Sequence, residues 1–219
     1  MLERRSPICD EPGRWNTRAQ QGGMETNTVV MPAAWHKGEF IKMTQYVALL
    51  GSINVGGNRL KMDELKAALE DKGFQKVATV VASGNVLFEH DKAPDAALSK
   101  RIAEVIKDRF GINSFAAVRS KAELQSGIED NPFAKDGEHK YVHTIFLAEP
   151  LDRAAFEAFA KAYDGPERIA AGTREYYVDY AEGVARSKLD PAMAKAKVIK
   201  CRATARNLRS LARMLDKMD

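Results

Sequence analysis

Apolar residues after Met43 follow two spacings, one typical of strands and one typical of helices. Short apolar runs bounded by glycine or other turn residues predict strands at 45–50, 77–82, 85–90 and 115–118. Apolar side chains recur every three or four residues over 61–72 and 94–110, which indicates helices, and Gly73 and Gly111 follow as residues that end helices. The predicted order in this stretch is β-α-β-β-α-β.

The same order is predicted again further along the chain. Strands are expected at 141–147, 167–171, 174–180 and 198–202, and helices at 151–163 and 187–196. Between the two halves, Ser120 and Glu123 have the spacing of a capping box, which predicts a connecting helix that runs to about Ile128. A final helix is expected over 205–218, with Thr204 as its N-cap.

The repeated order predicts an α+β fold, namely a tandem duplication of ferredoxin-like β-α-β-β-α-β units with an extra C-terminal helix. The first half spans 43–119, the connecting helix and loop 120–135, and the second half with its basic amphipathic C-terminal helix 136–219. Residues 1–42 show neither alternation nor helical spacing. We expect them to be a poorly structured extension, either a cloning remnant or an over-extended start.

The predicted topology gathers polar residues that are distant in sequence. In such a unit the loop after the first strand and the hairpin after the second leave the sheet at the same end. The first half therefore brings together two groups, Asn54, Gly56 and Gly57 in the loop and Ser83, Gly84 and Asn85 in the hairpin. In the second half, the ends of strands three and four are expected to bring Arg186, Ser187 and Lys188 close to Arg206 and Asn207.

The glycine-bearing stretch "INVGGNR" admits two interpretations. Glycines allow backbone N–H groups to approach a phosphate, and Arg59 and Lys61 add positive charge. However, Asp63 and Glu64 at the following helix start oppose an anion, and the stretch matches neither GxGxxG nor a P-loop. The alternative is a tight turn in which the glycines only supply backbone freedom.

Positive charge is concentrated near the C-terminus. The formal net charge is +4, but the segment 186–219 alone carries +7 and the rest of the chain carries −3. Arg206, Arg209, Arg213 and Lys217 recur at steps of three and four, opposite a stripe of leucine and methionine. This asymmetry favours an anionic partner, either nucleic acid or a phosphorylated small molecule; the alternative is a solvated helix face.

Other classes of protein receive little support. No apolar run approaches a membrane span, and Cys9 and Cys201 lack metal-type spacing, so we expect a cytoplasmic protein with no membrane partner, cofactor or metal. Ser187 and Lys188 are adjacent in a predicted helix and do not face one another as a catalytic pair would. The strand "REYYVDY" carries part of an RNA-recognition pattern, but it places Glu175 where an aromatic residue is needed.

Several short motifs occur in a fixed order: "YVALLGSINVGGNRLKMDEL", "ASGNVLF", "NPF", "REYYVDYAEGVARSKL" and "ATARNLRSL". With these motifs the chain resembles the domain-of-unknown-function 1697 family of bacterial proteins. The resemblance implies a fold of two ferredoxin-like halves and no established activity. The chain also departs from the family pattern, since the family usually has Arg-Gly where this chain has Gly51 and Ser52, glutamine in place of Ala82 and tryptophan in place of Leu208.

We therefore predict a binding protein for an anionic ligand, with activity as an enzyme left undecided. Arg186, Lys188, Arg206 and Arg209 would hold the anion, while polar residues of the two loop groups orient the ligand. The alternatives are a small-molecule enzyme with a site between the two halves and an assembly module that pairs exposed sheets. The sequence does not determine an oligomeric state.

Overall fold

The computed structural model describes residues 9–10, 14–15, 43–54, 59–80, 84–91 and 96–219. The chain divides into two units, Met1–Phe40 and Ile41–Asp219, of which the second is compact. In the first unit, β1 (Cys9–Asp10) pairs with β2 (Arg14–Trp15) in an antiparallel ladder. Most of the predicted extension 1–42 lies outside the described residues, so its state stays a prediction.

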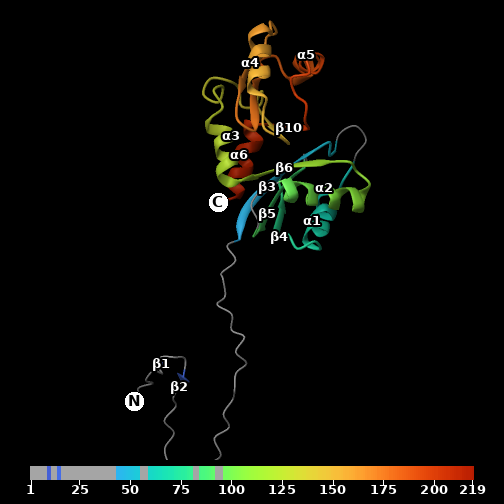
Figure 1. Cartoon of the computed structure of the whole chain (residues 1–219), viewed down its shortest axis with the longest axis vertical. Helices are drawn as coiled ribbons and strands as arrows, with labels where there is room; N and C mark the ends of the chain where they lie inside the picture. Colours follow the sequence, from blue (N-terminus) through green and yellow to red (C-terminus); the bar gives the residue numbers. More distant parts are fainter. Residues whose placement is uncertain (1–8, 11–13, 16–42, 55–58, 81–83, 92–95) are drawn as a thin grey trace, which may run out of the picture. The chain divides into compact units, whose positions relative to one another are not determined.

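The first sheet of the second unit is formed by β3, β4, β5 and β6, with two helices between them in sequence (Figure 1). The elements are β3 (Thr44–Gly51), α1 (Met62–Glu70), β4 (Gln75–Thr79), β5 (Asn85–His90), α2 (Ala96–Phe110) and β6 (Phe115–Ser120). All neighbouring strands are antiparallel, in the spatial order β4-β5-β3-β6. The first strand in sequence therefore lies between the third and the fourth.

The second sheet has the same arrangement of its four strands. Its elements are β7 (Val142–Leu147), α4 (Arg153–Ala162), β8 (Arg168–Ala171), β9 (Glu175–Asp179), the short η1 (Val184–Arg186), α5 (Leu189–Lys195), β10 (Ala203–Asn207) and α6 (Leu208–Lys217). Its spatial order is β10-β7-β9-β8, again fully antiparallel. The described chain is thus a mixed α/β protein with two four-stranded antiparallel sheets and six α-helices, which is compatible with the predicted duplication.

Helix α3 (Lys121–Glu129) connects the two sheets, and its start has the predicted capping box. The Ser120 side chain accepts a hydrogen bond from Glu123 N, and the Glu123 carboxylate accepts one from Ser120 N. After the helix, the buried Asn131 accepts from Phe133 N and contacts Thr144 on β7. The "NPF" motif therefore ends α3 and ties the connecting loop to the second sheet.

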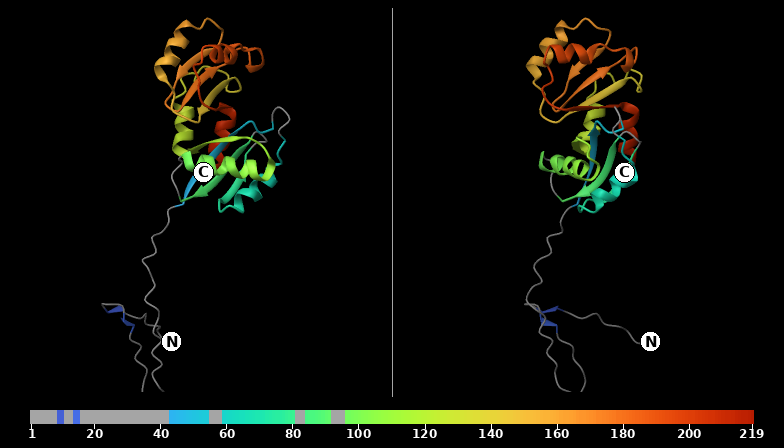
Figure 2. Two further views of the ribbon diagram at one scale, coloured as in Figure 1. Left: turned by 45° about the vertical axis from the view of Figure 1, so that its right-hand side comes forward. Right: turned by 90° about the vertical axis from the view of Figure 1, so that its right-hand side faces the viewer.

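Three apolar clusters fill the space around the sheets, and Figure 2 shows the ribbons of these sheets from two further sides. Alternate side chains of the first sheet pack against α1 and α2, and the second sheet packs in the same way against α4 and α5. The third cluster lies between the two sheets. There Val47 and Leu49 of β3 and Phe146 of β7 share a core with the apolar side of α6. Helices α3 and α6 therefore lie between the two sheets at this core, while β10 contacts β3 directly beside it, and each sheet is covered on both of its faces.

Two predicted boundaries near the C-terminus are wrong. The last strand is Ala203–Asn207 instead of 198–202, and the last helix begins at Leu208 instead of 205. The N-cap of α6 is Asn207, which accepts a hydrogen bond from Ser210 N at 2.9 Å, and not Thr204. The cause is tertiary: Thr204 and Arg206 are buried on the inner side of β10, where their side chains contact the first half.

Candidate functional site

The loop after β3 packs against the end of the β4–β5 connection, as the topology predicted. Leu50 N donates to Gly84 O at 2.8 Å, and a Cβ placed on Gly84 would lie 3.3 Å from the Cβ of Ile53. Asn54 is exposed, and its side-chain oxygen accepts a hydrogen bond from Leu60 N at 2.9 Å. The other predicted members of this group, Gly56, Gly57 and Ser83, lie outside the described residues.

Arg206 is a buried residue of β10 and does not belong to an exposed basic row. Only 7% of it is accessible to solvent. Its guanidinium donates to Leu50 O at 2.9 Å and to Thr204 Oγ1 at 2.7 Å, and it also bonds the side-chain oxygen of Asn85. Burial lowers the pKa of Arg206 to about 10.

The contacts of Arg206 and Asn85 show that both side chains are buried and hold the protein's own structure together. Asn85 is fully buried, and besides its bond with Arg206 it donates to Val80 O at 3.0 Å. Because Arg206 comes from the second sheet and Leu50 and Asn85 from the first, this network joins the two halves. The prediction of Arg206 as a solvent-facing cation is therefore wrong; its register on a strand turns it inward.

Arg186 and Lys188 line a pocket of about 560 Å³ beside the end of α4. The pocket also contains Tyr163 and Glu167, and the Tyr163 hydroxyl donates to the Glu167 carboxylate at 2.6 Å. Burial raises the pKa of Glu167, but hydrogen bonds from Ser187, Tyr163 and Lys188 N outweigh that effect and leave the pKa lowered. Asp164 and Glu182 line the pocket as well, so its carboxylates outnumber its cations.

Ser187 has a capping role, since its hydroxyl accepts a hydrogen bond from Leu189 N at 3.1 Å. The side chains around Arg186 and Lys188 come from α4, α5 and the loop 164–167, whereas Arg206 contacts Leu50 and Asn85. Arg186 and Lys188 therefore have different neighbours from Arg206, and the described contacts do not bring these predicted site residues together.

The exposed basic row on α6 consists of Arg209, Arg213 and Lys217. The opposite side of the helix, which includes Leu211 and Met214, is buried between the sheets. The cations recur at steps of four and therefore lie along one side of the helix. The row is shorter by one residue than predicted.

A second basic cluster, which the sequence analysis missed, lies where the two halves meet. A cleft of about 290 Å³ is lined by α2, β6, the end of β7 and the segments that precede β9 and β10. We call it the arginine cleft. Its charged residues are Lys100, Arg119, Arg174, Arg202 and Glu149.

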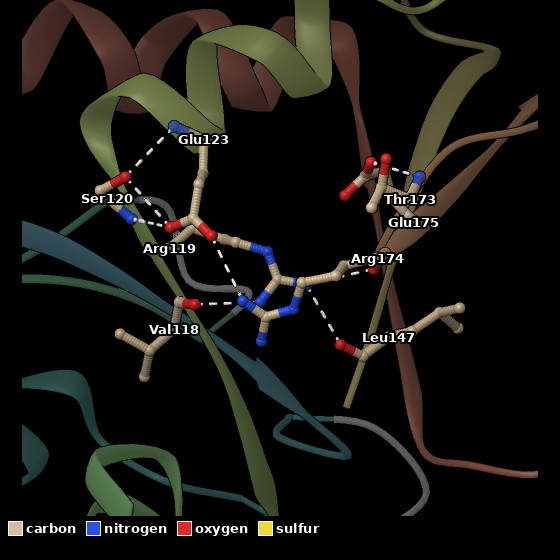
Figure 3. A network of polar contacts seen from close by, with 8 residues as sticks. All are labelled: Val118, Arg119, Ser120, Glu123, Leu147, Thr173, Arg174 and Glu175. Carbon is tan, nitrogen blue, oxygen red and sulfur yellow. Dashed lines mark hydrogen bonds and ion pairs between the residues drawn. The ribbon is translucent and has the colours of Figure 1, made fainter. Parts of the chain in front are cut away.

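Arg119 forms the buried part of this cluster (Figure 3). It donates to Val118 O at 2.9 Å, to Leu147 O at 3.1 Å and to Arg174 O at 3.2 Å. Its Nε atom is buried and has no hydrogen-bond partner within the part of the chain that the structure describes. Burial and, to a smaller extent, the neighbouring Arg174 lower the pKa of Arg119 to about 10, against raising effects from Glu123 and Glu175.

Arg174 and Arg202 approach the cleft from the second half. Arg174 forms an ion pair with Glu123 at 3.3 Å, and the same carboxylate caps α3 (Figure 3). Arg202 donates to Ser114 O at 2.8 Å and to Asn113 Oδ1 at 3.1 Å. One local signal for this site existed in the sequence: "FAAVRS" places an arginine at a position where the strand alternation requires an inward side chain.

The two antiparallel sheets and their helices make this a mixed α/β protein. The chain belongs to the family described as "Protein of unknown function (DUF1697)", whose sequence pattern matches residues 43–177. It is also similar to the solved structure of the conserved bacterial protein SP0830 from Streptococcus pneumoniae. The TM-score is 0.63 at 20% identity, over 81% of this chain and 99% of that chain, and the likeness concerns the fold. No curated protein matches the chain.

None of the helices within the described ranges combines the length and the apolar character that crossing a lipid bilayer requires. Among the same residues, no three histidine, cysteine, aspartate or glutamate side chains form a group that could hold a metal ion.

Proposed function

We propose that this protein binds a polyanion, in the first instance nucleic acid, through the exposed basic row of α6. The observation that carries the proposal is the orientation of the helix. Its apolar side is buried in the central core, which leaves Arg209, Arg213 and Lys217 on the solvent side. An α-helix rises about 1.5 Å per residue, so these cations span roughly 12 Å, enough to contact several successive phosphates.

The pocket at Arg186 and Lys188 supports an anionic ligand less well. Asp164, Glu167 and Glu182 line that pocket with them, so a phosphorylated metabolite would meet more negative than positive charge. Hydrogen bonds from the Ser187 and Tyr163 side chains and from backbone N–H groups lower the pKa of the Glu167 carboxylate, which keeps this negative charge in place at neutral pH. The basic row has only Asp216 as an acidic residue on the same helix.

We also infer that the two halves arose as a tandem duplication of a ferredoxin-like unit. Two observations support this: each half has the strand order fourth-first-third-second, and in each half a helix follows the first strand and another precedes the fourth. The covered sheet faces argue against an assembly module that works by pairing open sheets.

Fluorescence anisotropy with a short labelled DNA duplex and a single-stranded RNA, at several salt concentrations, tests the proposal. Three phosphate contacts predict that the logarithm of the binding constant falls with the logarithm of salt at a slope of about −3 for duplex DNA. Exchanging Arg209 and Arg213 for glutamate should abolish this binding.

The matched control is the double exchange Arg153→Glu and Lys161→Glu on α4, which changes the net charge by the same amount. It should leave binding nearly unchanged. If both double variants weaken binding equally, the basic row has no specific role and the attraction is that of net charge alone.

A further inference from the structure

We infer that the arginine cleft is a binding site for a small organic phosphate, separate from the basic row of α6. Arg119 of β6, Arg174 before β9 and Arg202 before β10 line one cleft, and Lys100 of α2 adds a fourth cation. The residues come from both halves, so the site exists only in the folded two-sheet unit.

The charge balance inside the cleft favours an anion. Four cations line it against one carboxylate, that of Glu149. The nearby Glu123 is already engaged, because it accepts hydrogen bonds from the backbone and hydroxyl of Ser120 and forms the ion pair with Arg174. Several like charges in a partly enclosed space repel one another, and a bound anion removes that repulsion.

Arg119 provides a second, independent observation. The residue is 1% exposed, and a buried guanidinium without a carboxylate bonded to it is costly. Its described acceptors are three backbone carbonyl oxygens, and its Nε atom has none in the described chain. The cation is stabilised only in part by the protein. An anion in the cleft would supply the missing opposite charge at short range, although Arg174 and Arg202 would make the direct contacts.

Size and lining indicate the class of ligand. The volume of about 290 Å³ is at the small end of ligand pockets, which excludes a folded polymer and suits a compact molecule. Arginine forks match phosphate oxygens with paired donors. The alanines of α2 and β6, together with Leu147, offer a narrow apolar wall for a short hydrocarbon body. A phosphate monoester with a small apolar substituent combines both properties.

Isothermal titration calorimetry in a phosphate-free buffer tests the site with two probes, inorganic phosphate and ethyl phosphate. We expect saturable one-to-one binding of both, with ethyl phosphate the tighter. Arg174→Gln and Arg202→Gln remove cations that are not fully buried, so folding is retained and can be verified by circular dichroism. Each exchange should weaken binding about tenfold or more, as expected for loss of a hydrogen bond between charged groups.

Two controls separate this site from the proposed polyanion surface. Arg153→Gln, an exposed arginine of α4, should leave phosphate binding unchanged. The double exchange of Arg209 and Arg213 to glutamate should abolish nucleic-acid binding and leave phosphate binding intact. Amide shifts of Phe115, Ala148 and Glu149 on adding ethyl phosphate, measured by NMR, would locate the ligand in the cleft.

Three results would overturn the inference. They are an absence of saturable binding to the wild-type protein, unchanged binding in both glutamine variants, and amide shifts confined to residues outside the cleft. An absence of nucleic-acid binding would not contradict this inference, since the basic row of α6 and the arginine cleft share no residue.

Discussion

Replacing Arg206 should weaken the junction between the two halves. The exchange Arg206→Met keeps much of the apolar stem and removes the guanidinium. Two of its acceptors, Leu50 O and Asn85 Oδ1, belong to the first half. A hydrogen bond that involves a charged group contributes about 1.5 kcal/mol or more, so losing both contacts should lower the free energy of unfolding by about 3 kcal/mol. For a domain of this size, that corresponds to a fall in Tm of roughly 6–12 °C.

The exchange Arg206→Lys separates charge from geometry. Lysine keeps the positive charge but presents a single ammonium group, which cannot reach the carbonyl, hydroxyl and amide oxygens that the planar fork contacts. A buried ammonium with fewer hydrogen bonds remains costly. The lysine variant should therefore be at least as unstable as the methionine variant.

Urea unfolding followed by far-ultraviolet circular dichroism measures both variants. Tryptophan fluorescence is unsuitable because Trp15 and Trp35 both precede the unit that contains the sheets. Arg213→Met, an exposed arginine of α6, serves as the control and should change stability by less than about 0.5 kcal/mol. The reasoning is refuted if Arg206→Met stays within that same margin, or if Arg206→Lys is as stable as the wild type.

Three further predictions concern the backbone, a histidine and the chain start. Gly84→Ala should lower the free energy of unfolding by roughly 1–2 kcal/mol because of its φ of +76°, and by more because the added Cβ would crowd Leu50. Gly111→Ala, with a φ of +68° and open space around it, should lower this free energy less. Urea unfolding measures both variants. Burial lowers the pKa of His143, so an NMR titration of the folded protein should give a pKa below 6.5. Because the unfolded chain then binds this proton more readily than the folded protein does, the free energy of unfolding should fall as the pH is lowered below about 6.5. Deleting residues 1–42 should leave the Tm nearly unchanged, because Ile41–Asp219 is a compact unit.

Local patterns predicted elements whose determinants are close together in sequence. The capping box of α3 needs only Ser120 and Glu123, three residues apart, and the structure confirms it. The repeated β-α-β-β-α-β order likewise follows from apolar spacing within each segment. The same reasoning placed the last strand at 198–202, because "VIKCR" is more apolar than "ATARN". The actual strand is stabilised by pairing with β7 and by contacts with the first half, which the segment itself does not encode.

The candidate sites show the same limit. The loop after β3 was correctly expected beside Gly84, because strand topology alone determines that neighbourhood. The arginine cleft could not be foreseen, since Arg119, Arg174 and Arg202 meet only through the packing of one half on the other. Arg206 was grouped with Arg209 because residues three apart share one side of a helix. The stretch "ATARN" fits the alternation of a strand as well as the spacing of a helix, so its sequence alone did not show that Arg206 belongs to a strand.

The position of α6 has a consequence for the order in which the protein is built. Val47, Leu49 and Leu87 of the first sheet share a core with Leu208, Leu211 and Met214, although about 120 residues or more separate them in the chain. During synthesis on the ribosome, the side of the earliest sheet that faces this core can be covered by α3 but lacks α6 until residues 208–217 have emerged. Completion of the first half therefore waits for translation of the second.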